Sequence, residues 1–576
     1  MIDPKNERWE TLVDRLARGE LDRRQFLALA GAAGVLSALG CAACEGTLAV
    51  DSAMAASEVQ RENRSALRDA YDYIVAGAGS AGCVLAARLA EAGAEVLVLE
   101  AGGDDTAAQV STPALWFTNL NTDRDWQLKA LPSPALSGRS APVATGRVLG
   151  GGGSINAMAW VRGLTSDYDG WRASGCPGWG FSDLLPIFKA LEDWQGGANE
   201  WRGAGGPIPI RTSSTRHPTA QAFVDGSRVM GLDVLEDMNA PMRAGAGFVN
   251  TNITSQGTRA SSARCFLRPA LVRRNLTLQL NAQVTKLTFK GTRCTGVSLV
   301  MNGASRAIRA RKEVLVTSGA IGSAKLLMLS GLGRAADLHA NGIVPLVDLP
   351  GVGSNLQDHA LILGVVFAYQ GKMPPSSPTS NAGEVAAFLR SSHSRRDPDI
   401  EIVNGEYPFV TPEVRERYGA LPPDAFTLGV SCTQPSGRGS VRLADADWRS
   451  PPTIDGPYLK TDHDLEVTLE AIELARQLGN DQGFDAVRAK EIVPGRKVDK
   501  QALVDLARNG AISFGHACGT CSMGTSGTVV VDPELRVHGV TGLRVCDSSV
   551  IPRIPSAPTN AIAHVIASRA ADLVLA

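Results

Sequence analysis

Six residues near the start of the chain carry the spacing of a dinucleotide-binding loop. Gly77-Ala78-Gly79-Ser80-Ala81-Gly82 matches the pattern G-x-G-x-x-G. The first glycine permits a tight turn, the second lets the backbone approach a pyrophosphate, and the third lets a helix pack closely on a strand. Free N–H groups and the positive end of the following helix then face the phosphates. We therefore expect cofactor contacts from Gly77, Gly79, Ser80, Ala81 and Gly82.

The elements around this loop support the same interpretation. The sequence predicts a buried strand over Tyr71–Ala76, a helix over Ala81–Ala92 that ends at Gly93, and a second buried strand over Glu95–Leu99. Glu100 ends that strand, about 20 residues after the loop, where a carboxylate accepts hydrogen bonds from ribose hydroxyls. A carboxylate there would repel a 2′-phosphate, so the sequence disfavours NADP.

A second glycine cluster follows at Thr145–Asn156, and it contains four successive glycines. Such a run leaves no side chains between the backbone and a flat ligand. Its neighbours Val148, Leu149 and Ile155 are apolar, so we expect the loop to be buried. Because only one dinucleotide fingerprint occurs, a reductase that uses both FAD and NAD is disfavoured.

Together these motifs resemble those of the glucose-methanol-choline (GMC) oxidoreductase family. The resemblance covers the chain from about Tyr71 to the C-terminus and leaves Lys372–Gly429 unassigned. In the second family signature, Ala324 stands where a proline is common. The similar segments are Gly146–Asn156 extended through Arg162-Gly163, Gly319–Gly333, Pro350–His359, Gln434–Val441, His516–Gly524 and Ser556–Asn560.

The resemblance implies the catalytic residues and the reaction. His516 stands in the segment that holds the catalytic histidine, and Asn560 stands where the family has His or Asn. Imidazole titrates near neutral pH and can take a hydroxyl proton, while an amide donates to the developing alkoxide without titrating. We therefore expect oxidation of an alcohol by hydride transfer to flavin N5, with His516 as general base. The alternative is a hydroxynitrile-lyase-type enzyme that keeps FAD on the same scaffold without net redox chemistry.

Further cofactor contacts are expected along the matched segments. Ile155 occupies the position where some relatives attach the flavin through a histidine, so FAD should be bound non-covalently. His359 should support the core beside the flavin domain, and His564 should belong to the core. The other expected cofactor contacts are Arg147, Val148, Gly151, Ser154, Asn156, Val284, Asp547 and Thr559.

The expected fold is α/β, with a Rossmann-like FAD-binding domain interleaved with a sheet-based substrate domain. The FAD-binding domain should comprise residues 71–155, 245–335 and 510–576. The substrate-binding domain should fill the gaps at 156–244 and 336–509. Helical periodicity predicts helices over Asp464–Leu478 and Asn560–Leu575.

The first 55 residues are typical of an export signal. Arg23-Arg24 precedes a short apolar stretch, Phe26–Gly40, and Ala53-Met54-Ala55 offers a cleavage site. A twin-arginine signal would engage the export machinery and deliver a folded, cofactor-loaded enzyme to the periplasm. Cys41 or Cys44 offers an alternative, a lipid-anchored N-terminus. Residues 56–70 should then form a linker.

Composition excludes other classes of function. The 576 residues include 57 basic and 58 acidic side chains, and this balance gives no overall attraction to nucleic acid. The spacing of the ten cysteines shows no four-ligand zinc pattern, so no metal is expected. The partners should be a small-molecule alcohol and an electron acceptor, which is oxygen or a quinone or another acceptor.

Overall fold

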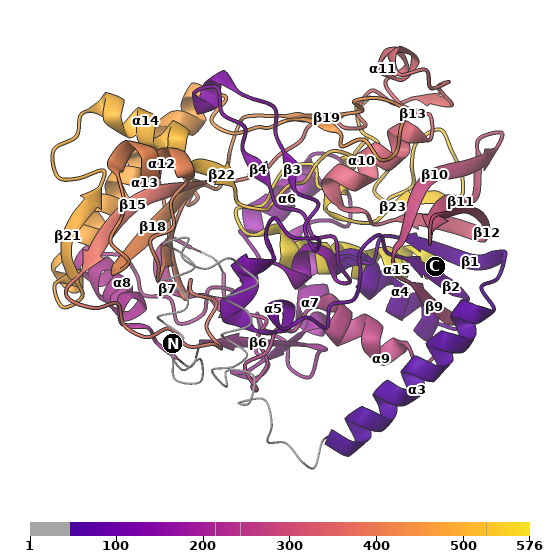
Figure 1. The fold of residues 1–576 in the computed structure, drawn as a ribbon, viewed down its shortest axis with the longest axis horizontal. Coiled ribbons are helices and arrows are strands. Elements are labelled where there is room, and N and C mark those ends of the chain that lie inside the picture. The colour runs from indigo at the N-terminus through magenta and orange to yellow at the C-terminus, as the bar shows by residue number, and fades with distance from the viewer. Residues whose placement is uncertain (1–45, 214, 242, 526) are drawn as a thin grey trace, which may run out of the picture.

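The computed structural model describes residues 46–576 except 214, 242 and 526. Two seven-stranded sheets occupy opposite halves of the molecule, and the chain passes between them several times (Figure 1). This arrangement confirms the predicted α/β fold, a Rossmann-like part interleaved with a second sheet-based part. Most of the predicted export signal, including Arg23, Arg24, Cys41 and Cys44, lies outside the described residues.

The first sheet has the predicted β-α-β unit at its centre. β1 (Ala70–Ala76) and β2 (Val96–Leu99) pair in parallel, and α4 (Ser80–Glu91) connects them. All four residues of β2 are buried, as expected for a parallel strand covered on both faces. The other strands are β9 (Leu276–Gln279), β10 (Ala282–Lys290), β11 (Arg293–Met301), β12 (Ala304–Val316) and β23 (Leu543–Val545), in the order β10-β11-β12-β1-β2-β9 with β23 beside β12.

Two buried helices pack on elements of the first half of the molecule. α15 (Thr559–Leu575) packs against α4, and α10 (Gly319–Leu329) packs against β10. Both helices are rich in small and aliphatic residues and are mostly buried. α15 confirms the predicted C-terminal helix.

The second sheet is antiparallel and carries its helices on one side. Its strands are β21 (Arg488–Val493), β15 (Ala360–Tyr369), β18 (Ala425–Cys432), β17 (Ile400–Gly405), β16 (Val385–Leu389) and β7 (Gly245–Phe248) in spatial order, with β22 (Ala511–Ser513) beside β15. The predicted helix over Asp464–Leu478 is α13 (Asp462–Asn480), which packs against β18 and β17. The helices α8 (Pro218–Val229), α12 (Pro412–Tyr418) and α14 (Lys500–Gly510) complete this half.

The remaining α-helices and strands lie outside the two large sheets. They are α5 (Ala108–Ser111), α6 (Thr165–Ala173), α7 (Phe181–Leu191), α9 (Arg268–Ala270), α11 (Ala335–Ala340), β3 (Leu128–Lys129), β4 (Pro142–Val143), β5 (Glu192–Trp194), β6 (Ile208–Thr212), β8 (Asn250–Thr251), β13 (Leu332–Gly333), β14 (Val347–Asp348), β19 (Ser440–Arg442) and β20 (Thr453–Asp455). Within the described part of the chain, no helix is both long enough and apolar enough to span a bilayer.

Strand pairing differs from the sequence interpretation at two positions. β7 and β22 fall in the segments predicted for the FAD domain, 245–335 and 510–576, yet they pair with β16 and β15 in the second sheet. Both are short strands whose partners are distant in sequence, so local pattern carries no information about which sheet they join.

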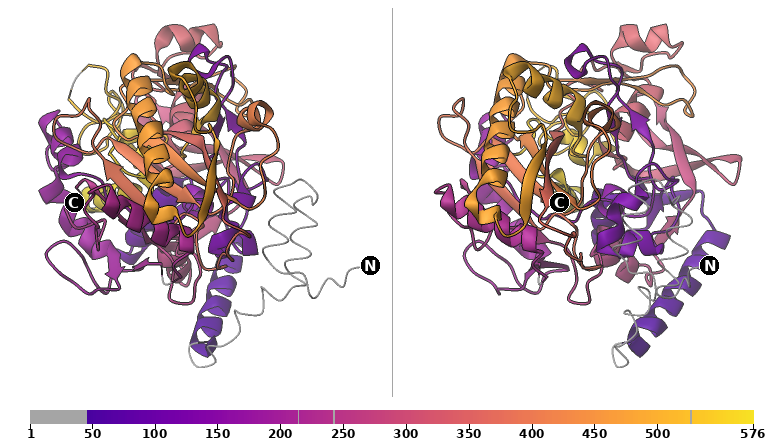
Figure 2. Two further views of the ribbon diagram at one scale, coloured as in Figure 1. Left: turned by 90° about the vertical axis from the view of Figure 1, so that its left-hand side faces the viewer. Right: turned by 60° about the vertical axis from the view of Figure 1, so that its left-hand side comes forward.

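Most of the interval predicted as a linker, 56–70, is helical. α3 (Gly46–Ser65) runs along the outside of the molecule and projects beyond it, as Figure 2 shows. Gln60 is buried and ties this helix to the first sheet, because its side chain donates to the carbonyls of Leu271 and Leu276 at 2.9 and 2.8 Å. The proposed cleavage site Ala53–Ala55 lies within this helix.

Candidate active site

The predicted dinucleotide loop joins the end of β1 to the start of α4. Gly77 has φ +112°, and a Cβ atom on it would lie 2.6 Å from the Thr317 carbonyl oxygen. A Cβ atom on Gly82 would lie 2.0 Å from the Gly77 carbonyl oxygen, so both positions require glycine for internal packing. At Gly79 a Cβ atom would meet no other segment closer than 3.9 Å. This second glycine therefore leaves space at the N-terminus of α4, where a pyrophosphate is expected.

The second glycine cluster packs directly on the first. The Gly150 N–H donates to the Ala78 carbonyl at 2.7 Å, and a Cβ atom on Gly151 would lie 2.8 Å from the Cα of Gly79. Val148 is fully buried in the same loop, and the Ser154 hydroxyl donates to the Leu149 carbonyl at 2.6 Å. The two loops therefore form one wall made of backbone, as the sequence predicted for a buried loop.

Glu100 holds the dinucleotide loop in place. Its buried carboxylate accepts the Ala78 N–H at 2.9 Å and the Gly102 N–H at 2.8 Å. Burial raises the pKa of Glu100, while these N–H groups and the nearby Arg147 oppose that rise. The carboxylate lies at the end of β2, as predicted, and its contact with a ribose remains a prediction.

Asn560 brings the C-terminal helix to the glycine loops. Its Nδ2 donates to the Ser80 hydroxyl at 2.9 Å, and a Cβ atom on Gly153 would lie 3.4 Å from the same Nδ2. Thr559 is buried and begins α15. Three segments far apart in the sequence therefore meet at Asn560.

His516 is buried against the end of the second sheet. Its backbone N–H donates to Asp358 Oδ1 at 2.9 Å, and its ring stacks on Phe514 with centroids 4.6 Å apart. The Nδ1 atoms of His516 and His359 lie 2.9 Å apart. Burial, with a smaller effect from His359, lowers the pKa of His516 well below its usual value, so the imidazole is neutral at pH 7.

His359 connects this histidine to the strand β18. Its Nε2 lies 3.0 Å from the carbonyl oxygen of Thr433, the residue after that strand. Burial lowers the pKa of His359 to about 4, so this ring is neutral as well. The neighbouring Asp358 carboxylate also accepts the Ser513 hydroxyl at 2.6 Å and the Tyr458 hydroxyl at 2.8 Å. A network of buried polar groups therefore holds both rings in position.

The remaining predicted cofactor residues lie around the same wall. Asp547 accepts hydrogen bonds from the Ser323 hydroxyl at 2.6 Å and the Gly319 N–H at 2.8 Å, so its carboxylate fixes the start of α10. Asn156 Oδ1 accepts from Arg259 at 2.7 Å, and Val284 is half-buried in β10. Their contacts with a cofactor stay predictions, because these bonds are internal to the protein.

The residues present fit a cofactor rich in acceptor oxygens. Arg147 Nε and Arg259 Nη2 are buried and have no hydrogen-bond partner in the described part of the chain. Arg259 also donates to the carbonyl of Gly153, so one unpaired N–H group lies beside the glycine wall. Buried donors without partners are costly. FAD supplies phosphate, ribose and ring acceptors that would satisfy them.

Sequence reasoning missed the contact between His359 and His516. It placed His359 beside the flavin-domain core and gave Thr433 no role. The available signal was that His359 ends Pro350–His359, a segment already matched to the family. His564 is buried in α15, as predicted, with Nδ1 2.8 Å from the Asn560 carbonyl oxygen. Cys518 and Cys521, the close pair after the signal, are free thiols.

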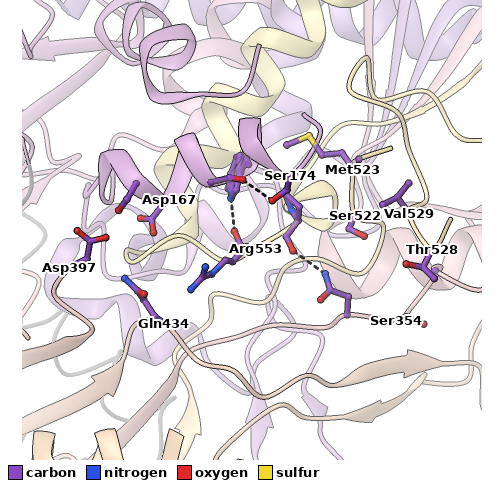
Figure 3. A pocket seen from close by; sticks show the side chains of 17 residues that line it. Asp167, Ser174, Ser354, Asp397, Gln434, Ser522, Met523, Thr528, Val529 and Arg553 are labelled. Carbon is purple, nitrogen blue, oxygen red and sulfur yellow. Dashed lines mark hydrogen bonds between the residues drawn. The ribbon is translucent and has the colours of Figure 1, made fainter. Parts of the chain in front are cut away.

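A separate cavity of about 460 Å³ lies between α6 and the 522–529 loop. Figure 3 shows Asp167, Gln434 and Arg553 around it. The Asp167 carboxylate is held by the N–H groups of Leu164 and Ser556, each at 2.8 Å. Neither His516 nor Asn560 lines this cavity, so it is distinct from the candidate active site.

Comparison with known proteins identifies the family to which these glycine loops and histidines belong. Two family models described as GMC oxidoreductase match residues 71–361 and 435–567. The chain is 36% identical to the oxygen-dependent choline dehydrogenase of Sinorhizobium medicae, with 88% of this chain and 95% of the relative covered. It is also 36% identical to human mitochondrial choline dehydrogenase, with 88% and 90% covered.

Solved structures give the same result. The crystal structure of pyridoxine 4-oxidase from Mesorbium loti matches with a TM-score of 0.83 and 32% identity, covering 87% of this chain and 98% of that one. A fungal aryl-alcohol oxidase has the same fold, with a TM-score of 0.77 at 23% identity over 88% of this chain and 99% of its own. These relatives are dehydrogenases and oxidases, and they give the lyase alternative no support. The chain belongs to the GMC oxidoreductase family and is an FAD-dependent oxidoreductase that acts on the CH–OH group of an alcohol.

Proposed function

We propose that His516 is the general base of this alcohol oxidation and that Asn560 donates a hydrogen bond to the same substrate oxygen. The contact between the Nδ1 atoms of His516 and His359 carries the proposal, because it determines which nitrogen of His516 is free to take a proton. FAD, when bound along the two glycine loops, supplies the hydride acceptor. The protein side chains hold the alcohol and move its proton.

The protonation pattern of the two rings follows from the Thr433 carbonyl. A carbonyl oxygen only accepts, so His359 Nε2 must carry the hydrogen that it donates at 3.0 Å. In a neutral ring the other nitrogen, Nδ1, is then an acceptor. His516 Nδ1 must therefore carry a hydrogen and donate it to His359 at 2.9 Å. This leaves His516 Nε2 without a hydrogen, as a general base requires.

The proposed role of Asn560 is to act on the same oxygen without titrating. Its amide has two N–H groups, and one of them donates to the Ser80 hydroxyl. The second is available to an alkoxide that develops while His516 removes the proton. Ser80 fixes the amide orientation, which is the preorganisation that makes such donors effective.

The test is single-turnover flavin reduction by an alcohol under anaerobic conditions. Replacing His516 by Ala should keep FAD and slow reduction on the order of 10²–10⁴-fold, as expected for a lost general base. Replacing Asn560 by Ala should cost about 2.7–4 kcal/mol, by analogy with oxyanion-hole donors. Wild-type reduction rates in the His516→Ala enzyme would rule out the proposal.

His359 provides a matched pair of variants for the same experiment. Leu at this position removes the acceptor for His516 Nδ1–H, a loss of about 1–3 kcal/mol for an unsatisfied buried donor, and should lower kcat with little change in KM. Gln can present an oxygen to His516 and an N–H to Thr433, so His359→Gln should recover most of the rate. Equal rates in His359→Leu and wild type would remove His359 from the mechanism.

Three finer properties are proposed with the function. FAD is held non-covalently, because buried Ile155 offers no nucleophile to the flavin; acid precipitation that leaves a coloured pellet would contradict this. Oxygen is the preferred electron acceptor, and a quinone or another carrier is the second choice. The names of the oxygen-dependent and oxidase relatives support oxygen.

We also propose export to the periplasm by the twin-arginine machinery, or alternatively a lipid anchor at Cys41 or Cys44. This proposal rests on the sequence of the first 55 residues.

A further inference from the structure

The helix α13 packs against the strand β18, and three side chains capable of binding a metal meet where they touch (Figure 1). Cys432 is the last residue of β18, and Thr433, whose carbonyl holds His359, follows it. His463 and Asp464 are the second and third residues of α13. The Cys432 sulfur, a ring nitrogen of His463 and a carboxylate oxygen of Asp464 all lie within 4.8 Å of one another. We call these three residues the strand–helix trio.

Two members of the trio have acceptor atoms that the protein leaves unused. Asp464 is 2% exposed, and its Oδ1 accepts the N–H and the hydroxyl of Ser436, but its Oδ2 accepts only the Gly437 N–H at 2.9 Å. A carboxylate oxygen has two acceptor positions, so Oδ2 keeps one. Within the described part of the chain, no ion pair involves Asp464, and no hydrogen bond reaches the ring of His463.

The chemistry of the trio favours one kind of cation. A thiolate, an imidazole and a carboxylate are the ligands by which proteins hold Zn²⁺, whereas Mg²⁺ and Ca²⁺ take oxygen ligands. Bonds of about 2.0–2.3 Å to a single tetrahedral ion place neighbouring ligand atoms roughly 3.3–3.8 Å apart. Because the three ligand atoms already lie within 4.8 Å of one another, shifts of about 1 Å suffice to reach this geometry.

The charges around the trio agree with a divalent ion. One thiolate and one carboxylate supply two negative charges, which balance Zn²⁺ in a buried setting. The basic side chain beside Gly437 is Arg438, and its guanidinium is occupied elsewhere. It donates to Asn355 Oδ1 at 3.1 Å and to the carbonyls of Pro435 and Gly437, each at 2.9 Å. Arg438 therefore leaves the Asp464 carboxylate without a counter-charge.

A cavity gives an ion a route to the trio. It has a volume of about 510 Å³, and His463 lines it together with His393. The two rings lie edge to face with their centroids 6.0 Å apart. Zn²⁺ takes four ligands, so a water molecule from this cavity would complete a shell that has three protein ligands.

We infer that Cys432, His463 and Asp464 bind one Zn²⁺ ion. The S–H bond of Cys432 breaks as the sulfur–zinc bond forms, and the proton passes to solvent without any change of oxidation state. The ion joins the first turn of α13 to the end of β18, one residue before Thr433. The spacing of the cysteines did not predict this site, because only one of its ligands is a cysteine.

Zinc binding is measured on untagged, FAD-loaded enzyme that has been treated with EDTA and then desalted. Titration with ZnCl₂ in a calorimeter should give one tight site per chain. Cys432→Ala and His463→Gln should each weaken that site at least about 100-fold, the upper end of the loss for changing a residue behind a ligand. Cys294→Ala and His339→Gln are the matched controls and should bind like wild type, because Cys294 is buried in β11 and His339 is exposed on α11.

X-ray absorption at the zinc edge identifies the ligands directly. Wild-type enzyme with one equivalent of zinc should show a sulfur ligand at about 2.3 Å beside nitrogen and oxygen ligands at about 2.0–2.2 Å. Zinc should also raise the Tm of the wild-type holoenzyme, and equal MgCl₂ should not. Neither metal should raise the Tm of His463→Gln.

The outcomes decide the inference without reference to turnover. A wild-type zinc shell without sulfur, or unchanged zinc affinity in Cys432→Ala and His463→Gln, would overturn it. An equal Tm shift with MgCl₂ would do the same, because it would show binding by oxygen ligands alone. If Cys432→Ala does not fold, the wild-type spectrum and His463→Gln still decide. A full rate of flavin reduction in His516→Ala would remove the proposed function and leave the zinc site standing.

Discussion

At the scale of single residues, the carboxyl group of Glu401 is buried, and its Oε2 has no hydrogen-bond partner in the described part of the chain. The pKa of Glu401 is raised by burial from 4.5 to about 8, and no group among residues 46–576 that the structure describes offsets that burial. Between these two values the unfolded chain ionises its carboxylate while the folded chain keeps the proton. Stability must therefore fall as pH rises through this window, at about 1.4 kcal/mol per unit difference in pKa.

This argument predicts a pH-dependent effect of Glu401→Gln on ligand-free protein. The variant should match wild type in Tm near pH 5 and exceed it increasingly up to about pH 8, with a constant advantage above that. Scanning calorimetry at pH 5, 7 and 9 measures it, with Ser431→Ala as the reference, because Ser431 is the cross-strand neighbour of Glu401 on β18. Parallel pH profiles for Glu401→Gln and wild type would show that the carboxyl group is already neutralised by another group.

At the scale of elements, two glycines of the strand–loop–helix unit differ in the space around them, and we predict that one serves folding and the other serves binding. A Cβ atom on Gly82 would overlap the Gly77 carbonyl, whereas a Cβ atom on Gly79 would meet only atoms at 3.9 Å, and Gly79 has φ −75°. Gly82→Ala should therefore destabilise the folded protein by about 1–3 kcal/mol or more, as overpacking does. Gly79→Ala should fold normally and retain less FAD, because its methyl group occupies the space left for the pyrophosphate.

The two variants are compared by the Tm of FAD-free protein and by the ratio of flavin to protein after purification. A full flavin complement in Gly79→Ala would show that the pyrophosphate does not approach this glycine. A wild-type Tm in Gly82→Ala would show that the loop can move away from α4.

At the scale of the whole molecule, the N-terminal segment joins the fold through α3. Cleavage near Ala55 would leave Gln60 in the mature chain, and with it the two hydrogen bonds that attach this helix to the first sheet. Replacing Arg23-Arg24 by Lys-Lys should keep the protein in the cytoplasm, folded and containing FAD. Cell fractionation measures this, and an unchanged periplasmic fraction would rule out the twin-arginine route. Membrane partitioning of the exported form would favour the lipid anchor.

The sequence by itself determined the parts of this protein whose pattern is local. The dinucleotide loop, its flanking strand and helix, and the C-terminal helix follow from spacing, apolar periodicity and glycine chemistry within a few residues of each other. For that reason β1, α4, β2 and α15 match their predictions within one or two residues. Motif resemblance then predicted that His516 and Asn560 act in one site, and this stays a prediction.

Only the tertiary structure decided which groups meet across long separations. The contact of His359 with His516 spans 157 residues, and that of Asn560 with Ser80 spans 480. Strand pairing is also decided by the tertiary structure, because no local pattern encodes the register between distant strands. Examples are the pairing of β7 and β22 with the second sheet. The pairing of Glu401 with Phe388 and Ser431 is another. A side chain's protonation and its lack of a partner are properties of its surroundings. The burial of Glu401 and the lack of a hydrogen bond at its Oε2 therefore became visible only in the folded structure.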